Sequence, residues 1–536
     1  MREFNVTGIC VPEMHYMVDI SEKVEQIFKI VEGKKYFTIN RGRQYGKTTT
    51  LRMLEKRMFH DYICASISFQ YSDDEMFANS EGFCQELLNR IYYSLLINYE
   101  EEAKLWLDNN ITSFAKLNRF ITERCRGKKI VLIIDESDEA SNNTIFVTFL
   151  KMLRDKFLNR NAGKDFTFHS VILAGVYDIR NLKQKMILSG NYTPSTGESA
   201  LNSPWNIAVD FDIDMSFSAN EIETMLVDYE NEHQTGMNIS EIAKEIRFYT
   251  SGYPYLVSRI CLLIEAKLNR NWTIEGVQEA IKIMLDEDST LFDDLTKKLE
   301  ENPELSDLLF DLSVGKIKYV FNTDNPIMKI GVMFGFLSKG TDGLQIHNKI
   351  FEIRIANYFV SKNNQKWREN NVVQTLTNDI IKNNVFDMEL CLNKFKKHYA
   401  EIYTDKDIKF LERNGKFIFL TYLVPLINGT GFYHFESQTR DSGKMDLVID
   451  FLKQQFILEL KIWYGDSKHQ DAYNQLANYL KSKNMESGYL LTFDFRKKDK
   501  NSSLLEGAEG DISENKWIEW DGKRIFDVVL RVGDNG

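Results

Sequence analysis

Short apolar, β-rich runs alternate with segments of helical spacing in the first 215 residues, and this alternation restricts the fold more than any other feature of the chain. Apolar positions in the intervening segments recur every three to four residues, as on one face of a helix. Several runs are apolar at nearly every position, which is typical of parallel strands covered on both faces. We therefore expect an α/β domain built on a parallel sheet over residues 1–215. The runs expected to form strands are 36–40, 63–69, 129–135, 168–175 and 205–211.

The pattern changes after residue 215, where the β-rich runs stop. Residues 216–300 show helical spacing throughout, beginning with a capping signal at Ser218 and Glu221, and they predict a helical lid. Residues 301–365 give a helix, a glycine-containing hairpin and a helix, the order of a winged helix. Residues 366–536 contain helical runs, a hairpin, and a further helix and strand. The length of 536 residues suits several domains, because one domain usually takes roughly 100 to 200 residues.

The composition limits where such a chain works and what it binds. Six scattered cysteines without a C-x-x-C pair argue against a zinc site or a disulfide framework and favour a reducing cytoplasm. The longest apolar run, 417–427, is far shorter than the roughly 18 residues of a membrane span. A net charge of −11 argues against coating nucleic acid by bulk attraction, but it allows a local basic groove. We expect a cytoplasmic protein that does not enter a membrane.

A phosphate-binding loop is predicted between the first apolar run and the helical segment after it. Gly46, Lys47 and Thr48 match the end of the pattern G-x-x-x-x-G-K-[ST], although Arg41 stands where the pattern has its first glycine and Gly42 follows it. In this pattern backbone N–H groups cradle the phosphates, the lysine reaches the β- and γ-phosphates, and the hydroxyl binds Mg²⁺. A polar helix cap is the simpler alternative.

Two acidic residues follow the apolar run 129–135. The magnesium ion of a bound nucleotide needs a carboxylate at the end of a neighbouring strand. Asp135 is placed for this role, and Glu136 is placed to orient and deprotonate the attacking water. A solvated strand end would explain this pair by itself, but not the pair and the loop together. The sequence therefore predicts a site for ATP and Mg²⁺.

The motifs HYMVDIS, NRGRQYGKTTTL, LIIDE, VILAGVYDIRNL and SGYPYLVSR together resemble the AAA-like ATPases of bacteria and archaea, relatives of the signal-transducing STAND group, over about residues 5–360. That family also tends to carry arginine at the first loop position. The resemblance implies that Tyr177 and Asp178 lie near the γ-phosphate and that Pro254 packs beside the nucleotide, although a helix start also explains the proline. Arg154 and Arg180 are both candidates for the arginine that completes the site. The residues expected to contact the nucleotide are Arg43, Gly46, Lys47, Thr48, Thr49, Asp135 and Pro254.

Two alternating apolar runs flank Lys453 and Gln454, a pattern that predicts an antiparallel hairpin. Side chains two apart share a face of a strand, so Glu459 and Lys461 are expected to point the same way. A turn centred between Lys453 and Gln454 would place Asp446 opposite Lys461 and diagonal to Glu459. Two carboxylates at that spacing can hold Mg²⁺ or Mn²⁺, and the lysine can orient a water that hydrolyses a phosphodiester. An ordinary Glu–Lys pair on a surface strand is the common alternative.

Residues 375–500 resemble the PD-(D/E)XK nuclease superfamily, which folds like restriction endonucleases. The motif that carries the resemblance is D-x(12)-E-x-K on a hairpin, followed by a helix with a glutamine and by a final strand. Asp446, Glu459 and Lys461 occupy this motif, with Met445 in place of a proline, and the resemblance implies that they form the catalytic core. Other positions that it implies are Gln475 on the later helix, Glu412 as a metal-binding carboxylate on an early helix, and Glu436 as a further candidate.

These expectations combine into a cytoplasmic, ATP-dependent nuclease that acts on nucleic acid, first of all DNA, as a homo-oligomer gated by its nucleotide. Defence against foreign DNA is expected by analogy, because an ungated nuclease would harm its own cell. An ATP-driven repair or mobile-element factor would use the same chemistry, and RNA stays open as a substrate. The alternative from another class is a STAND-like sensor or scaffold whose C-terminal domain binds nucleic acid without cutting it. The complete triad of the nuclease motif argues against that alternative.

Overall fold

The chain divides into two compact units. The first comprises Met1–Val277 with Met328–Leu337, and the second comprises Gln278–Ile327 with Ser338–Gly536. The four-part division expected from the sequence stays a prediction. The computed structural model describes residues 2–70, 76–108, 110–138, 140, 143–176, 205–313, 319–340, 343–368, 377–402, 408–427, 430–434, 447–463, 466–494 and 515–531.

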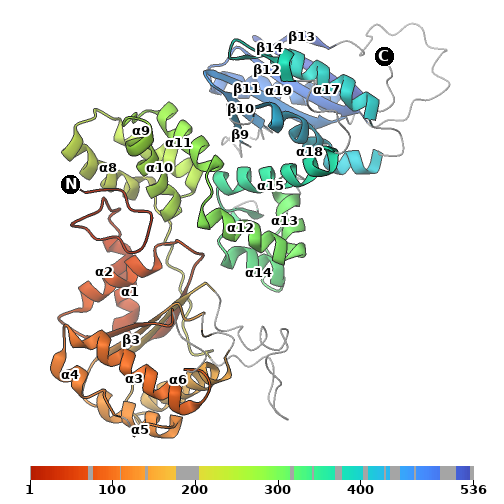
Figure 1. Ribbon diagram of the computed structural model, residues 1–536. Coiled ribbons are helices and arrows are strands. Elements are labelled where there is room, and N and C mark those ends of the chain that lie inside the picture. The colour runs from red at the N-terminus through yellow and green to blue at the C-terminus, as the bar shows by residue number, and fades with distance from the viewer. Residues whose placement is uncertain are drawn as a thin grey trace. The chain divides into compact units, whose positions relative to one another are not determined.

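The first unit is built on the expected parallel sheet. Its strands lie in the order β1 (Tyr36–Asn40), β4 (Ser170–Gly175), β3 (Ile130–Asp135) and β2 (Ile63–Ser68), and every neighbouring pair is parallel. All residues of β3 and β4 are buried, which explains their uninterrupted apolar sequence. Helices cover both faces of the sheet (Figure 1): α1 (Ser21–Glu32), α2 (Lys47–Met58), α3 (Ser80–Leu96), α4 (Glu100–Lys104), α5 (Phe114–Cys125) and α6 (Thr144–Asn161).

The strand expected at residues 205–211 is the exception among the five. Only Val209 reaches the edge of β1, where its N–H donates to the carbonyl of Tyr36 at 2.9 Å and forms an isolated bridge with Phe37. Aromatic packing on either side holds this segment, because Trp205 stacks on Tyr36 and Phe211 stacks on Phe37. The apolar residues that predicted a strand therefore pack against β1 without forming a further strand of the sheet.

The helices expected to form a lid begin at the predicted capping signal. Ser218 accepts from the N–H of Glu221, whose side chain accepts from the N–H of Ser218, so the capping box is present. The N-terminal segment contacts the first of these helices. A guanidinium nitrogen of Arg2 lies 2.7 Å from Asp228 Oδ2, and the hydroxyl of Tyr16 donates to Glu232 Oε2 at 2.6 Å. The helices that follow the sheet are α8 (Ala219–His233), α9 (Ile239–Thr250), α10 (Pro254–Lys267) and α11 (Ile274–Asp286).

The predicted helix, hairpin and helix of residues 301–365 are present in that order. The elements are α12 (Thr290–Glu301), α13 (Pro303–Ser313), α14 (Pro326–Met333), β5 (Leu337–Gly340), β6 (Gly343–Ile346) and α15 (Lys349–Arg368). The hairpin pairs two short strands, β5 and β6, and the long helix α15 after it packs on α13.

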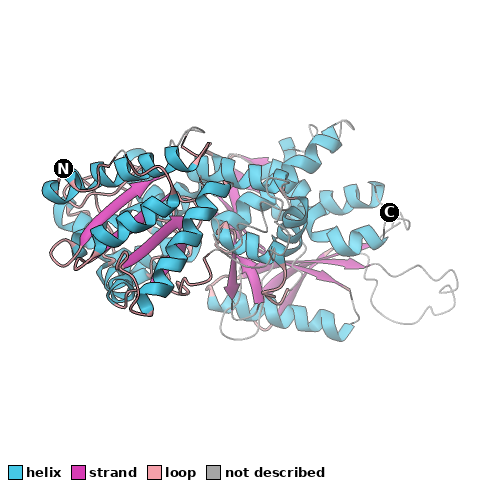
Figure 2. Ribbon diagram, turned by 90° about the horizontal axis from the view of Figure 1, so that it is seen from below, coloured by secondary structure: helices cyan, strands magenta, loops and turns pink. Residues whose placement is uncertain are grey.

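A six-stranded mixed sheet forms the C-terminal part of the second unit. The strand order is β13-β14-β12-β11-β10-β9, in which β11, β12 and β14 are parallel and the other pairs antiparallel. Figure 2 shows helices packed along these strands. The strands are β9 (Gly431–His434), β10 (Leu447–Phe451), β11 (Gln454–Ile462), β12 (Ser487–Asp494), β13 (Lys516–Trp520) and β14 (Lys523–Arg531), with a small pair β7 (Ile381–Lys382) and β8 (Val385–Phe386). The helices are α16 (Thr377–Ile380), α17 (Met388–Ile402), α18 (Ile408–Ile427) and α19 (Asp466–Ser482).

The hairpin of β10 and β11 has a register different from the expected one. Phe451 pairs with Gln454, so the turn residues are Leu452 and Lys453, and Leu447 lies opposite Leu458 rather than opposite residue 460. The turn shifts because Leu452 adopts a φ of +52° and because Gln454 is held in the strand. The side chain of Gln454 accepts from the N–H of Phe386 at 2.7 Å and donates to its carbonyl at 3.4 Å. The pairing predicted for Asp446 rested on the wrong turn, and Asp446 itself lies outside the described residues.

Among the helices that the structure describes, none combines the length and the apolar sequence needed to cross a membrane.

Candidate nucleotide and nuclease sites

The phosphate loop connects the end of β1 to the start of α2. Gly46 caps α2 with a φ of +75°, a left-handed conformation that glycine adopts without strain. Lys47 begins the helix with only 7% of its surface exposed, and its Nζ donates to the carbonyls of Arg41 and Gly42, both at 3.0 Å. Burial lowers the pKa of this lysine, against the opposing charges of Glu136, Asp138 and Asp135. The loop thus wraps around a buried ammonium group.

A hydroxyl and a carboxylate meet beside the loop because parallel strands end at one edge of the sheet. Thr48, in the first turn of α2, donates from its Oγ1 to Asp135 Oδ2 at 2.8 Å. Asp135 closes β3 and is 9% exposed. A threonine hydroxyl next to a strand-end carboxylate is the donor set that holds Mg²⁺ in phosphate-loop proteins, so these two residues fit the ion.

Two further acidic residues follow Asp135 in the sequence. Glu136 has a φ of +50°, which is uncommon for a residue other than glycine and is often found at functional sites. Asp138 was missed by the sequence reasoning. A Cβ added to Gly175, at the end of β4, would meet Asp138 Oδ1 at 2.4 Å, so the aspartate lies against the bare backbone of the neighbouring strand end. Asp138 follows Asp135 by three residues in DESDE, and this grouping of acids after a strand was the signal that could have found it.

Two arginines of the loop have different surroundings. The guanidinium of Arg41 donates to the carbonyls of Asn40 at 2.9 Å and Ile213 at 2.8 Å, and it lies over the ring of Phe211. Arg41 therefore ties the loop to the segment after the sheet, which explains an arginine at the first position. Arg43, predicted to contact the nucleotide, has an exposed side chain, and its carbonyl accepts from the hydroxyl of Tyr253.

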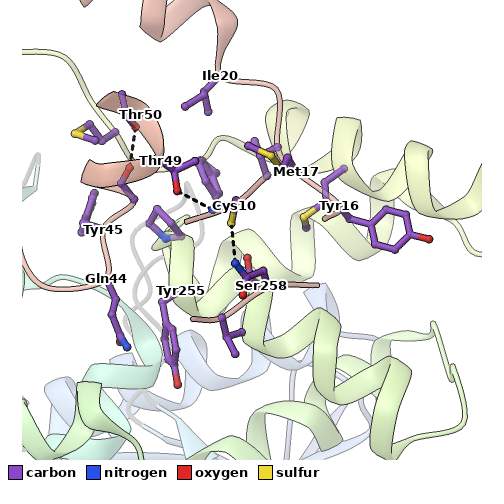
Figure 3. Close-up of a pocket in the computed structure, with 18 of the residues that line it drawn as sticks. Cys10, Tyr16, Met17, Ile20, Gln44, Tyr45, Thr49, Thr50, Tyr255 and Ser258 are labelled. Carbon is purple, nitrogen blue, oxygen red and sulfur yellow. Dashed lines mark hydrogen bonds between the residues drawn. The ribbon is translucent and has the colours of Figure 1, made fainter. Parts of the chain in front are cut away.

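A pocket of about 340 Å³ lies between the N-terminal segment, the loop and the lid of the first unit. Figure 3 shows Thr49 and Cys10 joined by a hydrogen bond, 3.3 Å from the backbone N of Cys10 to Thr49 Oγ1. Pro254 begins α10 and also lines the pocket, with its ring 3.8 Å from where a Cβ of Gly46 would be. The helix start is therefore confirmed, and the packing of this proline beside a nucleotide stays a prediction. A mostly apolar pocket with a few polar groups beside a phosphate loop fits the base and ribose of a nucleotide.

Four further residues were predicted for the first site. Tyr177, Asp178 and Arg180 lie outside the described residues. Arg154 lies on α6, and its role as a completing arginine stays a prediction.

The second candidate site lies on the face of the C-terminal sheet that α19 covers. Glu459, in the middle of β11, is fully buried. Lys461, two residues on and on the same face, places its Nζ 2.5 Å from Glu459 Oε1 and donates to Gln475 Oε1 at 3.1 Å. Three of the predicted catalytic residues therefore meet. Glu459 offers hard oxygen atoms of the kind that Mg²⁺ and Mn²⁺ prefer.

Three further carboxylates were predicted for the nuclease site. Asp446 and Glu436 lie outside the described residues, and Glu412 lies on α18 with its side chain likewise undescribed. Within the described part of the chain, no three acidic, histidine or cysteine side chains gather closely enough to hold a metal ion. The metal-binding roles of these residues stay predictions.

Comparison with known families bears on both regions. The AAA-like domain family matches residues 20–312, more than half of the chain. The chain belongs to the AAA-like domain family. Its C-terminal region, residues 433–503, matches the PD-(D/E)XK nuclease superfamily, so both resemblances predicted from the sequence are confirmed.

Solved structures with a similar arrangement share little sequence with this AAA-like protein. The Walker-type ATPase PABY2304 of Pyrococcus abyssi is 12% identical, with a TM-score of 0.45 over 66% of this chain and 99% of that chain. The ORC2 protein of Aeropyrum pernix, in ADPNP–ADP complexes, is 12% identical, with a TM-score of 0.38 over 67% and 98%. The Aeropyrum pernix ORC1 protein in complex with DNA is 12% identical, with a TM-score of 0.28 over 64% and 94%. No curated protein matches the chain.

Proposed function

We propose that this protein is a cytoplasmic, ATP-dependent nuclease. Its AAA-like part binds and hydrolyses ATP, and its C-terminal domain hydrolyses phosphodiester bonds of DNA with the help of Mg²⁺ or Mn²⁺. The observation that carries the proposal is the meeting of Glu459, Lys461 and Gln475 under α19. A fold that only bound nucleic acid would have no use for a fully buried glutamate paired with a lysine.

In the ATPase part, each proposed role follows from position. Lys47 leaves the carbonyls that it now contacts and binds the β- and γ-phosphates, because its ammonium lies inside the loop that cradles them. Thr48 and Asp135 would hold the Mg²⁺ ion that accompanies ATP. Glu136 orients the attacking water and accepts its proton.

In the nuclease part, Glu459 would hold a divalent ion together with Asp446 and Glu412, and the bound ion would offset the negative charge that develops on the phosphate. Lys461 orients the water that attacks phosphorus, and Gln475 fixes the lysine by accepting its hydrogen bond. Lys461 keeps about a third of its side-chain surface exposed, so a substrate can reach it.

Nucleotide gating is proposed from a contact of the phosphate loop. A Cβ on Gly42 would lie 2.6 Å from the carbonyl oxygen of Phe334, and Gly335 lies against the ring of Tyr253. The segment Met328–Leu337 therefore touches the loop, while the chain before and after it belongs to the second unit. A change in the loop on binding ATP would be passed along this segment to the nuclease part. Such a gate suits a homo-oligomeric nuclease that acts against foreign DNA.

The test is cleavage of linear and circular DNA with Mg²⁺ or Mn²⁺, with and without ATP. Glu459→Ala is expected to abolish cutting, and Lys47→Ala is expected to abolish its dependence on ATP. Glu486→Ala is a matched control, since it removes an exposed carboxylate of the same domain. If neither DNA nor RNA is cut under any nucleotide condition, the proposal fails and the sensor or scaffold takes its place.

A further inference from the structure

A second polar cluster lies on the same face of the C-terminal sheet as the proposed nuclease site. Asp527 of β14 is 8% exposed, and two side chains of α19 converge on its Oδ2. Tyr473 donates from its hydroxyl at 2.6 Å, and His469 Nε2 lies at 3.0 Å. A carboxylate only accepts, so Nε2 carries the proton, and Nδ1 faces the hydroxyl of Thr492 at 3.5 Å.

The cluster lies where it can fix the orientation of α19 on the sheet. The strand order is β14, β12, β11, and α19 contacts all three. His469 and Tyr473 fix one side of the helix to β14, whereas Gln475 reaches β11 on the other side and holds Lys461. Gln475 follows Tyr473 by two residues, which is about 200° around a helix. The helix α19 therefore links the Asp527 cluster to Lys461 of the proposed nuclease site.

We infer that Asp527, with His469 and Tyr473, sets the rotation of α19 and thereby positions Gln475 against Lys461. Asp527 acts through α19 and is a positioning residue. The inference rests on the proposed nuclease function, and it concerns a strand that lies beyond the superfamily match at residues 433–503.

The effect of losing this anchor follows from helix geometry. A side chain ends about 5–6 Å from the helix axis, so a roll of about 10° moves it by about 1 Å. A misplacement of about 1 Å can lower a rate about 100-fold, and loss of a supporting partner commonly costs about 10- to 100-fold. Burial and the charge of Asp527 raise the pKa of Tyr473, so this donor stays protonated.

The test compares DNA cleavage by the full chain and its variants with Mg²⁺ or Mn²⁺. Asp527→Asn is expected to lower kcat about 10- to 100-fold with KM unchanged, and Tyr473→Phe is expected to lower kcat less. In a Gln475→Ala background, Asp527→Asn should lower kcat no further, because the residue that it positions is gone. Asp521→Asn is the matched control, since Asp521 also pairs with α19, through exposed Lys481, and should leave kcat unchanged.

Amide hydrogen exchange of α19 separates failure of this inference from failure of the nuclease proposal. Asp527→Asn is expected to speed exchange in the first two turns of α19, and Asp521→Asn is not. If the wild type cuts nothing but α19 exchanges faster in Asp527→Asn, the anchor stands and the nuclease proposal fails. Multiplicative losses in the double variant, or unchanged kcat and exchange in Asp527→Asn, would overturn the inference.

Discussion

Adding one methyl group to the phosphate loop tests whether the loop's contact with residues 328–337 carries the nucleotide signal. In Gly42→Ala the new Cβ would lie 2.6 Å from the Phe334 carbonyl oxygen. Carbon–oxygen contacts of this kind lie at about 3.3–3.6 Å, so the two backbones must separate by about 0.7–1.0 Å. Gly42 does not have a positive φ, so alanine adds bulk without backbone strain.

The size of the effect follows from the cost of such overpacking, about 1–3 kcal/mol. If that cost falls on the docked position of residues 328–337, the ratio of docked to released forms falls about 5- to 150-fold. Residues 328–337 should then exchange amide hydrogens faster without ATP, and ATP should change the rate of DNA cutting less than it does in the wild type. Both are measured on the full chain, with ATP affinity determined separately.

Two variants serve as comparisons for Gly42→Ala. Tyr253→Phe removes the hydroxyl that donates to the Arg43 carbonyl without adding bulk, and it should loosen the same segment. Gly33→Ala, at the end of α1, places its Cβ no nearer than 3.4 Å to another atom and should change nothing. The reasoning would be refuted if Gly42→Ala bound ATP normally and showed the exchange and the ATP dependence of the wild type.

Three further predictions concern single side chains. Lys47→Ala should lose ATP binding, so ATP should raise the melting temperature of the wild type only, and equal shifts would contradict the loop assignment. Glu459→Gln should abolish cutting, but its melting temperature should be no lower than that of the wild type, since Lys461 can turn to solvent. Mg²⁺ should raise the melting temperature of the wild type only. An equal rise in both proteins would contradict metal binding by Glu459. Burial, with Lys34 and Arg160 nearby, lowers the pKa of His169 to about 4. The unfolded chain binds this proton near pH 6.5, so stability should fall between pH 6.5 and 4, and His169→Phe should reduce that fall in melting temperature.

Local sequence patterns predicted the parts of the fold that depend on local sequence. Continuous apolar runs gave the four strands of the parallel sheet, and the Ser218 capping signal gave the start of the lid. The contact between Thr48 and Asp135 could also be predicted, because parallel strands and the helix after the loop bring both to one sheet edge.

Features that depend on distant segments were missed. The turn at Leu452 and Lys453 is set partly by hydrogen bonds between Gln454 and Phe386, which lie 68 residues apart. The strand β14 was missed because charged residues interrupt its apolar run, and so was Asp527, whose partners lie on α19. Each of these residues can be read from the sequence, but the distant segment that it contacts is known only from the structure.

The buried carboxylates of both candidate sites bear on whether the protein cuts nucleic acid. Holding a carboxylate out of water costs several kcal/mol unless donors compensate it, and an apolar side chain of similar size is often at least as stable. Glu459 and Asp527 lie buried under α19, and one oxygen of Asp527 is buried without a hydrogen-bond partner among the described residues. Asp138 Oδ1, near the charge of Lys47, is in the same situation. Stability does not explain acids at these positions. Metal and phosphate chemistry would explain Glu459 and Asp138, and the positioning of α19 would explain Asp527. The sequence motifs select the same two places independently, and this agreement favours a protein that cuts its nucleic acid over one that only binds it.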